Sequence, residues 1–222
     1  MNKKRSPGSG RSVSNPGRHN AILNWRNVPE RDLWLYARSF HTAAKKLAGA
    51  VEPDSDPFTD FAACPVVFMY RHAMELHLKA IILGEGGNFL PTRPDILSIE
   101  KTHSVSWLAQ FICQIVTALN WEREFRCEGV ENLADFKAII EDVNSVDPGP
   151  YAFRYPANAE GRGSDRGHLA FSARGFARGM DALLELLDST ADALAATWDM
   201  RTGGAAPDGE LHGGSGFEPT IQ

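Results

Sequence analysis

Apolar residues return at intervals of three and four positions along five stretches of this chain, which is the period of an α-helix with one buried face. Strand-like alternation is nearly absent from the sequence, and its one short candidate is YAFRYP at 151–156. We therefore predict an all-α fold, a four- to five-helix bundle with long connections. The helical stretches cover residues 28–49, 61–83, 103–119, 133–143 and 172–198.

Glycine and proline mark where the predicted helices end. Three glycines at 84, 86 and 87 follow the second stretch, and the proline-containing residues 88–102 read as a long connection. Pro65 lies inside the second stretch, where it either kinks the helix or begins its main part. Residues 147–170 read as a long irregular segment, of a length that is usually functional or disordered.

The two ends of the chain differ in composition from this helical body. The first 20 residues hold five basic residues and no acidic one, and the last stretch is rich in glycine. Neither end can bury enough apolar surface to offset the entropy of ordering it. We predict a disordered basic tail over 1–26, one helical domain over 27–200 and a disordered Gly-rich tail over 201–222.

The charge of the body argues against a broad nucleic-acid-binding surface. The net charge of the whole chain is −5, and without the five basic residues of the first 20 the remainder carries 28 acidic against 18 basic residues, or −10. Such a body repels polyanions over most of its surface. Contact with RNA or DNA would then need a localised pocket or the basic tail.

Several other classes of protein find no support in the sequence. No apolar run reaches the ~18–20 residues of a membrane span, and the first 20 residues lack the apolar stretch of a signal peptide. The three cysteines show neither CxxC nor metal-finger spacing, so we expect reduced thiols. No metal-site or cofactor motif is recognisable. We therefore expect a cytoplasmic protein without metal, cofactor or membrane contact.

The segment 70–80 (YRHAMELHLKA) concentrates ionisable residues on a helix that otherwise looks buried. Arg71, Glu75 and Lys79 follow one another at i, i+4 spacing along one edge, with His72 beside them. This ladder of charges could simply face solvent. Alternatively, Arg71 and Glu75 point into a groove between helices, where a buried pair would mark a functional site or an interface.

Three segments of the chain resemble the HEPN domain, the higher-eukaryote and prokaryote nucleotide-binding family. They are YRHAMELHLKAIIL at 70–83, KTHSVSWL at 101–108 and AFRYPANAEG at 152–161. Their order and approximate spacing are similar to those of bacterial members, and the likeness extends over most of residues 30–198. The resemblance implies a HEPN-like bundle that forms a homodimer and works in a toxin or antiviral defence setting.

Active members of this family are metal-independent endoribonucleases that use an arginine and a histidine a few residues apart, usually across a dimer. Arg71 and His77 have five residues between them, and so do Arg162 and His168. Such a histidine would transfer the proton and the arginine would hold the scissile phosphate, with the RNA 2′-hydroxyl as nucleophile. In a continuous helix, however, Arg71 and His77 would project roughly 120° apart, which argues against one shared pocket.

The resemblance also suggests residues that could bind a ligand or a phosphate. His103 could do so or could belong to a helix cap, and Arg154, between Phe153 and Tyr155, could bind a phosphate or pair with Glu75. Two functions follow: an interaction or nucleotide/RNA-binding module, which we favour, and an endoribonuclease. The candidate ligand-binding residues are His72, Glu75, Lys79, His103, Arg154 and Tyr155.

We predict that the chain is a homodimer, because long amphipathic helices in a bundle of this size leave an apolar face over. Light scattering coupled to gel filtration should give twice the mass of the 24.4 kDa chain. A monomer mass at tens of micromolar protein would contradict both the dimer and any site composed from two chains.

Overall fold

A computed structural model describes residues 29–51, 57–146 and 172–203 of the chain. All the regular elements in these residues are helical, apart from an isolated bridge between Cys127 and Val130. The predicted all-α bundle is therefore confirmed. Its elements are α1 (Pro29–Ala50), α2 (Pro57–Leu83), the short 3-10 helix η1 (Glu85–Phe89), α3 (Ile96–Lys101), α4 (Val105–Ala118), α5 (Leu133–Val146) and α6 (Ala173–Thr202).

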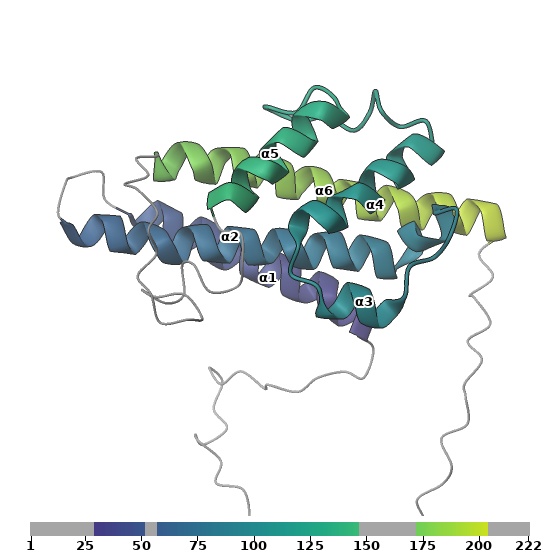
Figure 1. Cartoon of the computed structure of the whole chain (residues 1–222), viewed down its shortest axis with the longest axis horizontal. Coiled ribbons are helices and arrows are strands. Elements are labelled where there is room, and N and C mark those ends of the chain that lie inside the picture. The colour runs from purple at the N-terminus through teal and green to yellow at the C-terminus, as the bar shows by residue number, and fades with distance from the viewer. Residues whose placement is uncertain (1–28, 52–56, 147–171, 204–222) are drawn as a thin grey trace, which may run out of the picture.

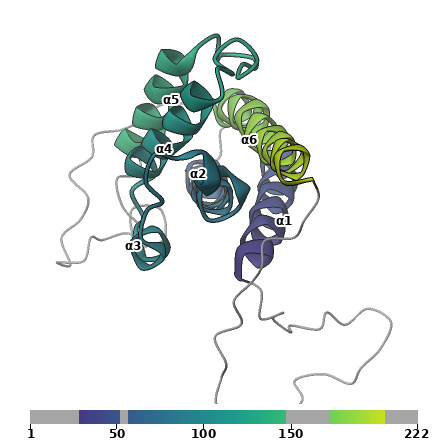
Figure 2. The ribbon, with the colours of Figure 1, turned by 90° about the vertical axis from the view of Figure 1, so that its right-hand side faces the viewer.

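Helix α2 occupies the centre of the bundle (Figures 1 and 2). It contacts α1 and α6 on one side and α3 and α4 on the other, and η1, which follows its C-terminal end, packs on both α4 and α6. Helix α5 packs on α4, outside this inner layer. Almost every residue of α2 from Tyr70 to Leu83 is buried as a result. Any ionisable side chain on this part of α2 must therefore find its partners within the protein.

The helix ends follow from local capping chemistry. The hydroxyl of Ser104 accepts a hydrogen bond from the Trp107 amide at 3.2 Å, and that of Ser172 accepts one from the Gly175 amide at 3.0 Å. These bonds satisfy amide groups that have no partner inside the first turn. Gly203 ends α6 with a φ of 67°, a left-handed conformation that glycine adopts without steric cost.

The sequence predicted most of these boundaries, with three differences. Helix α2 runs through Pro65 rather than beginning there. The predicted connection 88–102 contains the short helix α3, capped by Asp95, so the bundle has six α-helices among its described residues instead of four or five. Helix α6 ends at Thr202, four residues past the predicted end at 198. The predicted tails and the irregular segment 147–170 lie largely outside the described residues.

The core is aliphatic and aromatic and centres on the contacts of α2 with α4 and α6. Phe125 and Phe136 meet edge to face with ring centroids 5.2 Å apart, which joins α5 to the connection before it. Among the described helices, none has both the length and the apolar character needed to cross a membrane. The largest fully buried side chains include Tyr70, Met74, Leu78, Ile82, Leu108, Ile112, Ile115, Phe136, Ile140, Leu183 and Leu184.

The turn after α2 is packed so closely that it requires glycine. A Cβ atom at Gly86 would lie 2.5 Å from the carbonyl oxygen of Ile81 and 3.2 Å from the side chain of Ile115. The first contact is with main chain and cannot be relieved by a rotamer change. Gly86 thereby allows η1 to pack against both α2 and α4.

We predict that Gly86→Ala lowers the free energy of unfolding by about 1–3 kcal/mol, because the added methyl group overpacks this turn. Gly49→Ala in α1 is the matched control, since a Cβ there meets nothing within 4 Å and alanine is the better helix former. Chemical denaturation of both variants makes the comparison. Equal unfolding midpoints would show that the turn can move aside without cost.

Candidate functional site

Helix α2 carries ionisable side chains on two opposite sides, and each set joins a different network. Arg71, Glu75 and Lys79 share one edge because they are four residues apart. His77 follows Glu75 by two residues, so it projects roughly 200° away around the helix. The first set faces α3 and the start of α4, and His77 faces α1 and α6.

The Glu75 network consists of Arg71, Glu75, Lys79 and His103. The Glu75 carboxylate accepts a hydrogen bond from Lys79 Nζ at 2.9 Å and from Arg71 Nη1 at 3.3 Å. His103 Nδ1 lies 3.0 Å from the same Oε1 atom that Lys79 binds. The side chains of Arg71, Glu75 and Lys79 are 4%, 3% and 6% exposed, whereas that of His103 is 52% exposed. The charge ladder is therefore buried, as the second of the two interpretations expected.

The two cations of this network also bind main chain from the segment that follows η1. Lys79 Nζ donates to the carbonyl of Glu100 at 2.9 Å, near the C-terminus of α3. Arg71 Nη2 donates to the carbonyl of His103 at 2.8 Å, immediately before α4. Carbonyl groups at a helix end lack partners within the helix. The network thus fixes the α3–α4 connection onto α2.

The charge state of Glu75 reflects a balance between burial and its partners. Burial alone raises the pKa of this carboxyl group, but the hydrogen bond and positive charge of Lys79, together with those of His103, outweigh it. The net result is a pKa below its usual range, so Glu75 remains ionised at neutral pH. A buried carboxylate held in this way is coupled to the folding of the helices around it.

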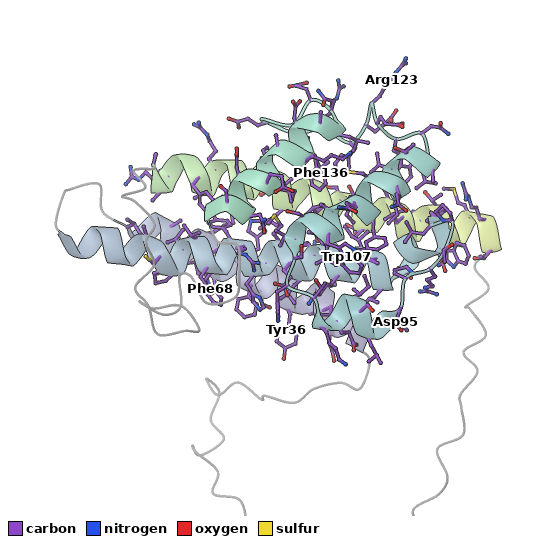
Figure 3. The ribbon with its side chains drawn as sticks, in the orientation of Figure 1. Tyr36, Phe68, Asp95, Trp107, Arg123 and Phe136 are labelled. Carbon is purple, nitrogen blue, oxygen red and sulfur yellow. The ribbon has the colours of Figure 1, made fainter. Side chains whose placement is uncertain are left out.

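His72 belongs to neither network and lies among aromatic rings. Its imidazole stacks on Phe68 with centroids 5.7 Å apart and an interplanar angle of 7°. The ring of Phe40 on α1 meets it edge-on at 4.4 Å. Figure 3 labels Phe68 on α2 and Tyr36 on α1, both on the side away from α5. His72 therefore packs between α1 and α2 through these ring contacts.

The His77 network is the second polar cluster, and His77 is the only member that was predicted as a site residue. Asp181 on α6 accepts a hydrogen bond from the Tyr70 hydroxyl at 2.8 Å and lies 2.8 Å from His41 Nε2. Asp188, two turns further along α6, binds the Arg38 guanidinium through both carboxylate oxygens, with a shortest contact of 2.6 Å. The network consists of Arg38, His41, Tyr70, His77, Asp181 and Asp188.

Burial shapes the protonation of two members of this network. Burial, the hydrogen bond to Asp181 and the charge of that carboxylate all raise the pKa of Tyr70, which therefore acts as a hydrogen-bond donor. Burial lowers the pKa of His77, and the charge interactions with His41 and Arg38 add to this. The hydrogen bond of His77 to the Ala73 carbonyl and the charge of Asp188 oppose the shift without cancelling it.

Arg71 and His77, the predicted catalytic pair, do not come together. Arg71 ends at Glu75 and His103, whereas His77 bonds to Ala73 and faces Asp188 and His41. The body of α2 separates them, as the angle between their helix positions indicated. The other predicted positions, Arg154, Tyr155, Arg162 and His168, lie outside the described residues.

The sequence did contain a signal for the missed residues. Basic positions recur in α1 at Arg38, His41 and Lys45, and acidic positions recur in α6 at Asp181, Glu185 and Asp188, at helical spacing in both cases. The two series pair across the helices through the contacts of Arg38 with Asp188, His41 with Asp181, and Lys45 with Glu185. Matching the charges of these two stretches would have predicted that α1 and α6 are antiparallel neighbours.

The chemistry that these clusters can perform is limited because most of their side chains are buried or half-buried and are hydrogen-bonded within the protein. Arg71 and Lys79 are buried, and each already donates to Glu75 and to a main-chain carbonyl, so neither cation is presented to a phosphate in solvent. Within the part of the chain that the structure describes, no three His, Cys, Asp or Glu side chains are grouped so that they could hold a metal ion. His103 is the exposed member through which the Glu75 network meets solvent.

Comparison of the chain with family models, with curated proteins and with solved structures finds no match in any of the three.

We predict that Glu75→Gln lowers the free energy of unfolding by about 3–5 kcal/mol, because it removes the buried carboxylate that both Arg71 and Lys79 bind. The variant should also change the response to acid. Since the pKa of Glu75 is lower in the folded chain than its ordinary value of 4.5, its stabilising effect is complete above that pH and is lost as the pH falls through the folded-state pKa. Thermal melts from pH 7 to pH 3 should show a weaker acid dependence in the variant.

Glu185→Gln is the matched control for this experiment. Glu185 also pairs with a lysine, at 3.0 Å from Lys45 Nζ, but its side chain is 65% exposed. Removing an exposed pair of this kind should change stability by about 1 kcal/mol or less. Equal effects of the two substitutions would contradict a structural role for the buried network.

Proposed function

We propose that this chain is a HEPN-like interaction module that binds a protein partner, including a second copy of itself, and does not cleave RNA through Arg71 and His77. The proposal is supported by the order of the three HEPN-like segments in the sequence and by the all-α bundle. A place in toxin or antiviral defence remains part of the same proposal and rests on the resemblance alone.

The observation that carries this proposal is the separation of Arg71 from His77 by the body of α2. Metal-independent cleavage needs a proton-transfer group and a phosphate-binding cation that reach the same phosphate. In this chain the two side chains end in different networks, between different helices. His77 is also only 1% exposed, so an RNA strand cannot reach its imidazole without a large rearrangement.

Charge favours a protein partner over a nucleotide or RNA. Arg71 and Lys79, the cations of the candidate site, are buried and bound to Glu75. The α4–α5 region is acidic, with seven acidic and three basic residues between positions 122 and 142. Figure 3 shows one of those basic residues, Arg123, projecting away from the bundle. A surface of this sign repels a phosphate backbone and suits a partner with basic or apolar residues.

The competing function is a metal-independent endoribonuclease, and it now depends on Arg162 and His168. Their spacing is the same as that of Arg71 and His77, and both residues lie outside the part of the chain that the structure describes. A cleavage assay therefore separates the two functions, because the proposed ribonuclease chemistry requires a histidine and an arginine but no metal ion.

We predict that the purified full-length protein leaves a panel of single-stranded RNAs intact in EDTA. The measurement is gel analysis of end-labelled RNA, with end-group analysis for 2′,3′-cyclic phosphates. His77→Ala should make no difference to the RNA, whereas its thermal melt should shift downwards because the ring is buried. Light scattering of the same sample reports whether a second copy is bound.

His168→Ala is the variant that could contradict the module. Metal-free cleavage that falls on the order of 10²-fold in His168→Ala, in protein that still melts cooperatively, would establish the endoribonuclease instead. RNA binding without cleavage, weakening steeply with added salt, would indicate a nucleic-acid ligand in place of a protein partner.

A further inference from the structure

The protonation of His77 is fixed on one side by its own helix. Its Nδ1 atom lies 2.9 Å from the carbonyl oxygen of Ala73, one turn earlier in α2. A carbonyl oxygen can only accept a hydrogen bond, so Nδ1 must carry a proton. In the neutral ring the lone pair then resides on Nε2, on the side that faces α1 and α6.

The Nε2 atom is buried and has no hydrogen-bond partner among the described residues. The closest acidic atom is Asp188 Oδ1 at 3.9 Å, beyond hydrogen-bond distance. An ionised carboxylate cannot donate to a lone pair in any case. Asp188 is also held by Arg38, whose Nε atom binds the same Oδ1 at 3.0 Å. The place where α1, α2 and α6 meet thus contains a buried imidazole, that of His77, whose Nε2 atom can take up a proton.

The charged groups around His77 come from all three helices. From α1, Arg38 and His41 face it, and the ring of His41 lies 6.4 Å away between centroids. From α6, the carboxylate of Asp188 lies 3.9 Å from His77 Nε2. Asp181 contacts His41, which in turn lies beside His77. From α2 itself, Tyr70 binds Asp181. Lys45 of α1 pairs with Glu185 at 3.0 Å and lies 3.9 Å from Asp181.

We propose that His77 is a proton-sensitive joint: the neutral ring holds α1 and α6 on α2 at neutral pH, and proton uptake at Nε2 loosens that attachment in mild acid. A proton on Nε2 would create a buried cation beside Arg38 and His41. It could be neutralised only by drawing Asp188 closer, and Asp188 already binds Arg38 through both oxygens. Opening the joint to water is the alternative response.

The direction of this effect follows from linkage between protonation and folding. The pKa of His77 is lowered in the folded chain, chiefly by burial. The unfolded chain therefore binds the proton more readily, and the contribution of the neutral ring is complete above a pH of about 6.5 and falls below it. This is opposite to a histidine whose pKa is raised by a carboxylate partner.

Hydrogen exchange of the full-length protein tests this proposal. Between pH 7.5 and pH 5.5, the protection factors of amides in α6 near Asp188 should fall by up to about tenfold, the limit for one proton at one pH unit below 6.5. Amides of α4 near Ile112, which do not depend on this joint, provide the internal reference. A uniform decrease over both helices would overturn the local mechanism.

Histidine-selective NMR measures the joint directly and does not depend on a variant that folds. The wild-type spectrum should show His77 as the neutral tautomer with a protonated Nδ1 at pH 7, titrating below pH 6.5. Asp188→Asn removes the facing carboxylate and should move this titration to still lower pH. A charged His77 at pH 7, or the Nε2-protonated tautomer, would overturn the proposal.

His77→Asn supplies the last comparison, since asparagine keeps a polar side chain and carries no charge. The drop in α6 protection between pH 7.5 and pH 5.5 should disappear in this variant, whatever its overall stability. An undiminished drop would assign the acid response to His41 or to the carboxylates, and the joint at His77 would be excluded.

Discussion

The buried carboxylate of Glu75 is the interaction on which the arrangement of the bundle depends. Helix α2 is enclosed on nearly all sides over its second half, so a charge there cannot be stabilised by water. Two cations at i, i+4 spacing, Arg71 and Lys79, neutralise it. The spare donors of these cations bind the carbonyls of Glu100 and His103. The need to pair the buried charges of α2 thus determines where α3 and α4 lie.

The other side of α2 obeys the same physical rule with different residues. Tyr70 and His77 face outward from α2 toward α1 and α6. Tyr70 donates a hydrogen bond to Asp181 of α6, whereas His77 Nε2 lies 3.9 Å from Asp188 without a hydrogen bond. Arg38 and Lys45 of α1 pair with Asp188 and Glu185 of α6, mostly at exposed positions where each pair stabilises little. Their value is in specificity, since a basic series on α1 meets an acidic series on α6 and so favours the pairing of these two helices. Apolar packing supplies the stability, and the ion pairs favour α1 and α6 as neighbours.

Periodicity in the sequence predicted the long helices well, because each one buries a single face over several turns. Helix α3 was missed since its six residues make fewer than two turns and follow two prolines. The orientation of Arg71 and Glu75 could not be decided from the sequence alone. Charges at i, i+4 look the same on an exposed and a buried helix, and the deciding partners are main-chain carbonyls that lie 21 and 32 residues away.

The His77 network shows a different limit of sequence reasoning. His41 and Asp181 are separated by 140 residues, and neither belongs to a recognisable motif. A single histidine on a helix face carries little information until the helix opposite is known. The complementary charge series of α1 and α6 would have given that neighbour, because both series have helical spacing. The charge patterns of two helices, compared with each other, therefore predict a site of this kind better than the pattern of one segment.

The geometry also limits how a second copy of the chain could complete a catalytic site. The Arg71 side chain is 4% exposed, and it is bound to the main chain just before α4. A histidine from a partner subunit could reach this guanidinium only after the α3–α4 connection had moved away from α2. That movement would also break the hydrogen bonds of Arg71 and Lys79 to the carbonyls of His103 and Glu100. Dimerisation through the outer faces of the helices requires no such loss, so self-association and catalysis at Arg71 are separate questions in this fold.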